Sequence, residues 1–580
     1  MCWRPPLRPK IILHNPTMTA SHWHHRLPFL SWPRLSGKLL HTELFAGLSV
    51  GLMVIPQGVA YAALAGMPLI TGIYASLLPA LVAVLFSAST RLSVGPTALT
   101  AMLVSASLAG MAAPGSTEWV NLAIWLSVLT GLLQVVLGFA RFGWLLNLVS
   151  SPVLTAFTQG AAVIILGSQL PALLGMKGGW SDLPHLSGIN LYSLAFGLVS
   201  LAVLLLSKRL KPTFPTVLVV VLGAAGLSWG LGLQAQGVAV VGALPQGLPV
   251  LVLPHGIGWA ALQQLVLPTL VITLVSFLET ASSAKVDNER KGQRWDQDQD
   301  LIGQGLGKLA SALSGAFPTS SSFSRSALNL YAGAQTGWAT VISVVVILLA
   351  LLVLTPVLAH VPQSVLSAIV LAAVLGLLKP QTFVRLFKVN RVEGVIALLT
   401  FGITLASAPR LYWGVLAGVV MGLSYFLHTR LHPRIIEVGL HPDGSLRDRH
   451  LWKLPPLAHH LYALRMDAEL DFAAASGLER AITEHLSAHH GVRHVCLFAQ
   501  PINRIDVTGV ESFAQIRRQL AAHGITLHIS GIKLPVETAL RRAGELQETP
   551  SLRMYRTDAE AIAALRLLEP LPQDMAAAAI

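Results

Sequence analysis

Long apolar runs recur along the first three quarters of the chain. Stretches of about 20 mostly apolar residues repeat from Glu43 to Arg430 and then stop, and a helix of this length crosses the hydrocarbon core of a bilayer. The runs predict about fourteen membrane spans. They lie at 43–64, 67–87, 97–110, 119–140, 148–170, 190–207 and 214–232, and then at 264–284, 299–316, 322–335, 338–359, 363–378, 391–408 and 410–429.

The two sets of seven spans correspond to each other. In each set the third member is short and follows Gly, Pro or Ser residues: SVGPTALTAML at Ser93–Leu103 and FPTSSSFSRSALN at Phe317–Asn329. Interrupted segments at equivalent places indicate an inverted-repeat transporter, with its substrate between facing half-helices. We therefore expect a polytopic α-helical membrane protein, with a transport domain at 43–430. Its first repeat (43–232) and second repeat (264–430) would form a seven-plus-seven inverted repeat with two half-helices.

The hydrophobic period changes after Pro455 and Pro456. Runs typical of strands then alternate with runs typical of helices, which predicts a small α/β domain at 456–565. The remaining segments are predicted as a cytoplasmic leader (1–42), a linker (431–455) and a tail (566–580).

One turn in this domain carries candidate chemistry. In IDVTG, at a predicted strand-to-helix junction, Asp506 can cap the helix and Thr508 presents a hydroxyl at its N-terminus. Phosphate is favoured at such a place, so Thr508 is a candidate regulatory phosphorylation site. The alternative is that Thr508 is an ordinary residue of a helix cap.

Composition and charge agree with a membrane protein. The chain is 53% hydrophobic and 12% charged, with a net charge of +13. Residues 1–430 hold 24 Lys and Arg against 10 Asp and Glu, whereas residues 431–580 hold 16 against 17. The excess cations lie in short loops between spans, where the positive-inside rule explains them better than nucleic-acid binding does. We expect a multi-pass protein of the plasma or bacterial inner membrane, with both termini cytoplasmic and no nucleic-acid partner.

The sequence offers no catalytic or metal-binding pattern. Cys2 and Cys496 are far apart, the histidines lack the spacing of zinc ligands, and no Walker loop, G-x-S-x-G elbow or H-E-x-x-H helix occurs. We expect no enzymatic activity, no cofactor and no metal.

Arg325 is a full charge inside a predicted span. Such a residue is costly in hydrocarbon unless it faces protein or water, so it indicates function. A short helix starting near Ser322 would point the backbone N–H groups of Ser322, Phe323 and Ser324 at a bound anion, and Arg325 would add its charge. The alternative is a kinked helix whose serines bond their own backbone and whose arginine reaches the interface.

The first half-helix offers a matching surface. Pro96 fits the first helical turn, which leaves Thr97 and Ala98 with outward-pointing N–H groups. Two half-helix dipoles and one arginine favour an anion over a cation. In the first span, Gln57 and Tyr61 are four residues apart and lie on one helix face, where they can line a cavity or bond a neighbouring helix.

Two further ionisable residues lie in predicted spans. Glu279 is deep in its span and can carry a proton, or it can simply neutralise Arg325, and the two roles can coexist. Lys308 lies among small residues in GQGLGKLASALSG. From there it could reach the cytoplasmic surface, and we interpret it as structural.

Two long stretches resemble a known family. AGLSVGLMVIPQGVAYAALAGMPLITGIYASLLPALVAVLFSASTRLSVGPTAL and DLIGQGLGKLASALSGAFPTSSSFSRSALNLYAGAQT are similar to the SulP, or sulfate permease, anion transporters, and the resemblance covers about residues 40–560. The C-terminal part resembles the STAS domain. The resemblance implies fourteen spans, a core domain that moves against a gate domain, and a homodimer.

The resemblance also implies site residues. The acidic position of the eighth span falls on Glu279. Related sodium-using bicarbonate transporters have aspartate there, so glutamate is more similar to the proton-coupled branch. The anion-contacting positions of the family fall on Gln57, Tyr61, Thr97, Ser322, Phe323, Ser324 and Arg325.

The sequence departs from the family pattern at four places. Ser321 replaces the glycine of the commoner PxTGSFSRS motif, which puts the width or selectivity of the site in doubt, and Lys308 stands where a small polar residue is usual. In the STAS region Gln500 replaces a frequent aspartate and Thr508 a frequent serine. Both changes weaken the case for phosphorylation or nucleotide binding.

These inferences predict a secondary active transporter. It would move a small anion, such as sulfate, bicarbonate or a dicarboxylate, together with protons, by alternating access. One alternative is a sodium-coupled bicarbonate transporter. Another is a membrane-anchored scaffold with little transport, whose STAS domain binds a cytoplasmic protein partner.

Overall fold

The computed structural model describes residues 27–176, 189–210, 215–243, 245, 247–292 and 294–568. The chain divides into two compact units, Met1–Gly422 and Leu423–Ile580. Most of the predicted leader and most of the predicted tail lie outside the described residues.

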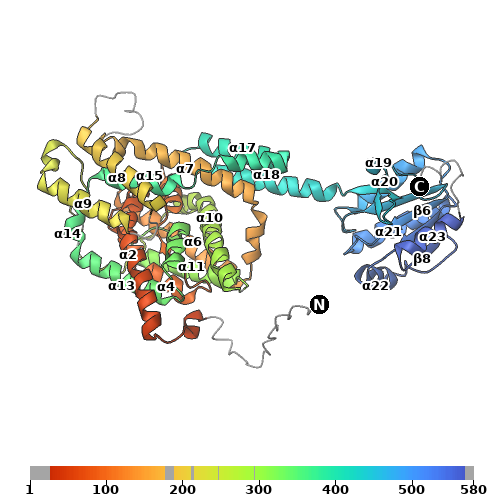
Figure 1. Ribbon diagram of the computed structural model, residues 1–580, viewed down its shortest axis with the longest axis horizontal. Helices are drawn as coiled ribbons and strands as arrows, with labels where there is room; N and C mark the ends of the chain where they lie inside the picture. Colours follow the sequence, from red (N-terminus) through yellow and green to blue (C-terminus); the bar gives the residue numbers. More distant parts are fainter. Residues whose placement is uncertain are drawn as a thin grey trace, which may run out of the picture. The chain divides into compact units, whose positions relative to one another are not determined.

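The first unit is built of packed helices (Figure 1). In the described part of the first repeat they are α2 (Gly37–Leu64), α3 (Thr71–Tyr74), α4 (Leu78–Phe86), α5 (Ala98–Leu108), α6 (Thr117–Phe139), α7 (Ser151–Leu173), α8 (Leu191–Leu210) and α9 (Thr216–Gly230), with short 3-10 turns at Pro28–Ser31, Gly143–Leu148 and Leu233–Gln236.

The second repeat supplies the other helices of this unit. Its helices in the described residues are α10 (Trp259–Lys291), α11 (Gln297–Leu313), α12 (Phe323–Tyr331), α13 (Trp338–Val353), α14 (Thr355–Leu358), α15 (Gln363–Leu375), α16 (Gln381–Val389), α17 (Arg391–Ala406) and α18 (Tyr412–Leu431), the last of which continues into the second unit.

The helices confirm the polytopic helical fold. Each predicted span contains a helix, and α16 is an additional short helix that the apolar runs did not predict. Within the described residues, five helices are long and apolar enough to cross a membrane by themselves: α2, α6, α7, α10 up to Glu289, and α18. The other apolar helices are shorter, as expected where helices are interrupted inside a bundle.

A two-residue ladder joins the repeats ahead of their half-helices. β1 (Val94–Gly95) pairs antiparallel with β2 (Ser320–Ser321), with Val94 opposite Ser321. The N–H of Ser322 also donates to the carbonyl of Ser93 at 2.9 Å. The ladder therefore places the starts of α5 and α12 next to each other.

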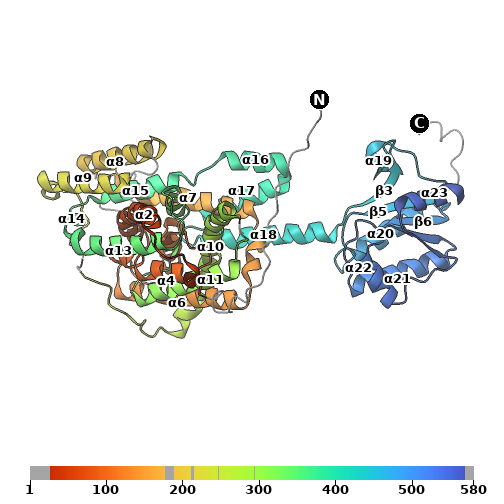
Figure 2. The same cartoon turned by 60° about the horizontal axis from the view of Figure 1, so that its bottom comes forward.

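Small residues let α11 approach its neighbours closely. A Cβ added to Gly131 of α6 would lie 2.8 Å from the carbonyl oxygen of Gly305 in α11, and one added to Gly307 would lie 3.0 Å from the Cβ of Ala83 in α4. Close packing of this kind is typical of membrane helices. It holds α11 between α4 and α6, which lie beside it in Figure 2.

The second unit is an α/β domain built on one sheet. Its strands are β3 (Ile435–Leu440), β4 (Leu446–Asp448), β5 (Leu461–Met466), β6 (His494–Phe498), β7 (Thr526–Ser530) and β8 (Leu552–Tyr555), in the spatial order β4-β3-β5-β6-β7-β8. β5 to β8 are parallel, whereas β3 is antiparallel to β4 and β5.

Helices cover the two faces of this sheet. Alternate strand residues point to opposite faces, so Val495 and Leu497 pack with α20 (Ala475–Ala488), α21 (Val507–Ala522) and α22 (Leu534–Arg542). Cys496 and Phe498 face the other side, where α23 (Asp558–Leu568) supplies Ala561 and Leu565 to a second core.

The start of this domain differs from the sequence-based boundary. The stretch 431–455, predicted as a linker, contains β3, β4 and the short helix α19 (Arg449–Trp452). Ile435 pairs with Met466, so this segment belongs to the sheet. The domain therefore begins before residue 456, and β3 covers an edge of β5 that would otherwise have unpaired backbone groups.

Candidate functional site

Arg325 is the third residue of α12, and its side chain is only 1% exposed. Its Nε donates to the hydroxyl of Ser93 at 3.2 Å, and its Nη1 donates to Oε1 of Gln57 at 3.4 Å. Its Nη2 is buried and has no hydrogen-bond partner among the described residues. A buried donor of a charged group without a partner is unusual, and it leaves hydrogen-bonding capacity for an anion.

Both half-helices begin at a polar cap. The hydroxyl of Thr97 accepts from the N–H of Thr100 at 3.2 Å, and the hydroxyl of Ser322 accepts from the N–H of Arg325 at 3.5 Å. The first N–H groups of a helix have no intrahelical acceptor, so the starts of α5 and α12 present donors and positive dipole ends. Ala98 is the first residue of α5 and is buried.

Glu279 of α10 lies against the first half-helix. The hydroxyls of Thr97 and Thr100 each donate to its Oε2 at 3.2 Å. The two threonines are three residues apart around the start of α5 and so share one face. This contact connects the predicted anion residues of the first repeat to the predicted proton carrier.

Gln57 and Tyr61 of α2 complete the group. Both side chains are buried, and the Tyr61 hydroxyl lies close enough to Arg325 and Glu279 to interact electrostatically with both. The structure thus brings Gln57, Tyr61 and Thr97 together with Glu279 and Arg325, as the sequence predicted. Four helices from the two repeats supply them: α2, α5, α10 and α12.

The remaining predicted residues of α12 are placed differently. Ser322 caps the helix and is half-buried, whereas the side chains of Phe323 and Ser324 are exposed, Phe323 to 57%. The Ser324 hydroxyl lies 3.4 Å from that of Ser322. The side chains of Phe323 and Ser324 do not join the buried cluster, so only their backbone N–H groups are available to the predicted site.

Lys308 lies deeper than the sequence indicated. The small residues around it allowed a path to the cytoplasmic surface, but it is 0% exposed, and its Nζ donates to Oε1 of Gln134 in α6 at 2.9 Å. The reason is the close packing of α11 against α4 and α6, which leaves no path to the surface. The position of Lys308 well inside a predicted span was the available signal that it could be buried among the helices.

Sequence reasoning also missed other polar residues of this region. Ser93 and Thr100 lie close to predicted residues. Thr100 could have been predicted from the sequence, because it follows the cap residue Thr97 by three positions. Ser321, which replaces the usual glycine, is fully buried and accepts from Nε2 of Gln304 at 3.1 Å. Its hydroxyl is therefore engaged with α11.

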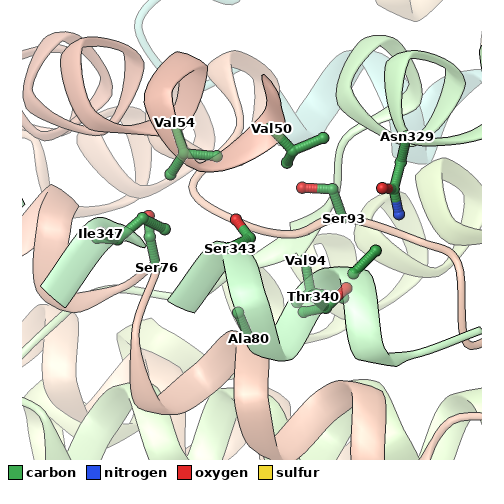
Figure 3. Close-up of a pocket in the computed structure, with 11 residues that line it drawn as sticks. Val50, Val54, Ser76, Ala80, Ser93, Val94, Asn329, Thr340, Ser343 and Ile347 are labelled. Carbon is green, nitrogen blue, oxygen red and sulfur yellow. The ribbon is translucent and has the colours of Figure 1, made fainter. Parts of the chain in front are cut away.

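A small cavity lies beside the site and is separate from the predicted anion contacts. It measures about 10 Å³ and lies between α2, α4, β1, α12 and α13 (Figure 3). Ser93, Asn329 and Ser343 point into it from three of these segments, and Oδ1 of Asn329 is buried without a partner. The space suits one water molecule and excludes a polyatomic anion.

Thr508 lies in the second unit, as the second residue of α21, and is exposed. The predicted cap is confirmed: Oδ1 of Asp506 accepts from the N–H of Gly509 at 2.8 Å, and its Oδ2 accepts from the N–H of Phe472 at 3.0 Å. The Thr508 hydroxyl is therefore not required for capping and remains accessible at the start of the helix.

Comparisons with known proteins agree with this architecture. Residues 40–400 match the sulfate permease family, and residues 457–561 match the STAS domain. Probable sulfate transporter 4.2 of Arabidopsis thaliana is 32% identical to this chain, and the match covers 87% of this chain and 77% of that protein. A probable sulfate transporter of Mycobacterium tuberculosis is 29% identical over 95% of this chain and 99% of its own.

Solved structures show the same fold. The structure of SLC26A9 matches with a TM-score of 0.83 at 20% identity, covering 95% of this chain and 94% of its own. The transmembrane domain of the cyanobacterial bicarbonate transporter BicA matches with a TM-score of 0.57 at 21% identity, covering 67% of this chain and 99% of its own. The chain is therefore not an enzyme: it belongs to the sulfate permease family of multi-pass membrane anion transporters and carries a C-terminal STAS domain.

Proposed function

We propose that the chain is a secondary active transporter of a small inorganic or carboxylate anion, with sulfate as the first candidate, and that it works by alternating access with proton coupling. The observation that carries the proposal is the buried Nη2 of Arg325, which has no hydrogen-bond partner in the part of the chain that the structure describes. It lies at the start of α12, next to the start of α5. There the charge of the guanidinium and the positive ends of two helix dipoles act together on a bound anion. The sulfate transporters among the relatives support sulfate as the first anion to test.

In this proposal the anion binds between the two half-helices. Arg325 supplies the charge. The backbone N–H groups at the starts of the two half-helices come from Thr97, Ala98, Ser322, Phe323 and Ser324. Gln57 and Tyr61 line the opposite side. Gln57 also accepts from Nη1 of Arg325, so it orients the guanidinium.

Glu279 is proposed as the proton carrier. Its Oε2 accepts two threonine hydroxyls at the start of α5, and it interacts electrostatically with Arg325. An ionised Glu279 partly cancels the positive potential of Arg325, whereas a protonated Glu279 leaves that potential to the anion. Binding of a proton and binding of an anion therefore favour each other, which is the requirement for symport.

The cellular setting follows from the same reasoning. We place the protein in the plasma or bacterial inner membrane with both termini in the cytoplasm, because the cations of the predicted loops collect on one side. We further propose a homodimer and a cytoplasmic protein partner for the STAS domain. Thr508 is the proposed phosphorylation site, since its exposed hydroxyl lies at the start of α21.

Transport in proteoliposomes tests the proposal. The full-length protein is reconstituted, and uptake of radiolabelled sulfate is measured with an inward proton gradient, an inward sodium gradient or neither. We expect uptake that rises with the proton gradient and collapses with a protonophore. Uptake driven by sodium and indifferent to pH, with competition by bicarbonate, would instead support the sodium-coupled bicarbonate transporter.

The scaffold alternative has a separate outcome. If folded protein moves neither sulfate, bicarbonate nor a dicarboxylate, the transport proposal fails. Arg325→Ala supplies the internal comparison, since it removes the charge on which the anion site depends. Capture of a cytoplasmic protein that is unaffected by Arg325→Ala, together with absent flux, would then support a scaffold.

A further inference from the structure

Lys308 is a fully buried lysine of the first unit, and the anion site as proposed above does not include it. Its side chain is 0% exposed, and its Nζ donates to Oε1 of Gln134 at 2.9 Å. An ammonium group taken out of water is strongly unfavourable unless an opposite charge or several acceptors compensate it. A single amide oxygen compensates only part of this loss.

Gln134 is held so that its oxygen faces Lys308. Its Nε2 donates to the hydroxyl of Ser276 at 2.9 Å and to the carbonyl of Thr273 at 3.1 Å, both in α10. With both donors of the amide directed at α10, Oε1 is the atom left for Lys308. The amide thus fixes the lysine against the same helix that carries Glu279.

Glu279 is the acidic group near this lysine. It follows Ser276 by three residues in α10, so the two share a helix face. Lys308 and Glu279 interact electrostatically. Tyr61 of α2 and Arg325 of α12 also interact electrostatically with Glu279.

We propose that Lys308 is a fixed cation of the anion site, which balances the charge of Glu279 from within the protein. Two cationic side chains and one carboxylate leave the site with a net positive charge even when Glu279 is ionised. Na⁺ is then not needed to offset Glu279 when the anion binds, whereas a proton on Glu279 still makes the site more positive and favours the anion. The inference rests on the proposed function, because it assigns a role to Lys308 in that same site.

A charge-balance cycle tests this role. Full-length wild type, Lys308→Met, Glu279→Gln and the double variant are purified, and binding of radiolabelled sulfate is measured in sodium and in choline buffers. Lys308→Met should weaken sulfate binding about tenfold or more, because Glu279 then cancels Arg325. The double variant restores the net charge and should bind within a few fold of wild type. Wild-type binding should be equal in the two buffers.

The pH profile separates an electrostatic role from a structural one. Sulfate binding by Lys308→Met should recover as the pH is lowered, because Glu279 then takes up a proton. Sulfate binding by the double variant should stay constant over the same pH range, because this variant lacks the carboxylate. Lys285→Met is the matched control, because Lys285 is an exposed lysine of α10 outside the site. It should leave binding and its pH profile unchanged.

Thermal unfolding without any anion gives a readout that does not depend on transport. Lys308→Met leaves a buried carboxylate without its cation and should lower the midpoint temperature, and adding Glu279→Gln should recover part of the loss. If the double variant is no better than Lys308→Met in both binding and unfolding, the pairing with Glu279 is wrong. If this cycle behaves as expected but wild type carries no anion, only the proposed transport function fails.

Discussion

Arg325 of the second repeat donates its Nε to the hydroxyl of Ser93 of the first repeat, at 3.2 Å. The residues are held together by the ladder in which Val94 pairs with Ser321. The guanidinium is therefore positioned by backbone geometry as well as by its own helix. Changes on either side of this contact should alter anion binding.

Replacing Arg325 by Gln should weaken sulfate binding by roughly 10- to 100-fold, the range expected for losing a charge-assisted hydrogen bond. Ser93→Ala should have a smaller effect, because it removes one neutral partner and leaves the charge. Equilibrium binding of radiolabelled sulfate to the purified protein measures both. Arg385→Gln, at an exposed position of α16, is the control. Unchanged binding by Arg325→Gln would place the anion elsewhere.

Gly95→Ala should reduce anion affinity although it changes no charge. A Cβ at this position would lie 3.3 Å from Nη2 of Arg325 and 3.5 Å from the hydroxyl of Ser76. It would occupy space next to the one guanidinium nitrogen that has no partner. Gly115→Ala is the matched control, since Gly115 also has a positive φ, of 78°, and a Cβ there meets nothing within 4 Å. Equal sulfate affinities for the two variants would show that Nη2 does not contact the anion.

Glu279→Gln should abolish uptake driven by a proton gradient while it preserves sulfate binding. The amide cannot release a proton, but it keeps the size of the side chain and can still accept from Thr97 and Thr100. Proteoliposome flux at several external pH values gives the result, and Glu289→Gln, at an exposed residue of α10, is the control. Proton-driven uptake by Glu279→Gln would remove it as the carrier.

The STAS domain should lose stability in mild acid through His528. This side chain is fully buried, with its Nδ1 3.1 Å from the hydroxyl of Tyr555 and its Nε2 3.1 Å from His494. Burial first, and then the neighbouring charges of His494 and Arg553, lower the pKa of His528 to about 4. The unfolded chain takes up a proton near pH 6.5, so the stability present above that pH falls as the pH drops towards 4. The total loss is at most about 3 kcal/mol.

Hydrogen exchange of the β7 segment in the full-length protein measures this effect. Wild type is compared with His528→Phe at each pH, so that intrinsic exchange rates cancel. We expect the protection of β7 in wild type, relative to the variant, to decrease between pH 7 and pH 5. A constant ratio would contradict the assignment to His528.

Much of the fold could be predicted because it depends on local sequence. Span lengths follow from apolar runs, and the two half-helices follow from Pro96 and from the serines before Arg325. The strand β4 was missed because it is a short edge strand whose side chains are only partly buried. The strand β3 was missed because its sequence, IIEVGL, has only a weak alternation of apolar and polar residues.

The site was predictable only in part, for a physical reason. The charges of Arg325 and Glu279 were visible because ionisable residues are rare in spans. The burial of Lys308 was not visible, because it depends on α4 and α6, whose packing against α11 no local pattern specifies. Similarly, the hydrogen bond of Ser321 to Gln304 depends on tertiary packing.

The ladder between β1 and β2 also has a consequence for synthesis of the protein. Val94 and its partner Ser321 are separated by more than two hundred residues, so the anion site cannot form until α12 has been made and inserted. Contacts with such a large sequence separation form late. Until then the first repeat lies in the bilayer with Gln57 and Thr97 not yet opposite Arg325, which makes the early membrane intermediate the stage most exposed to quality control.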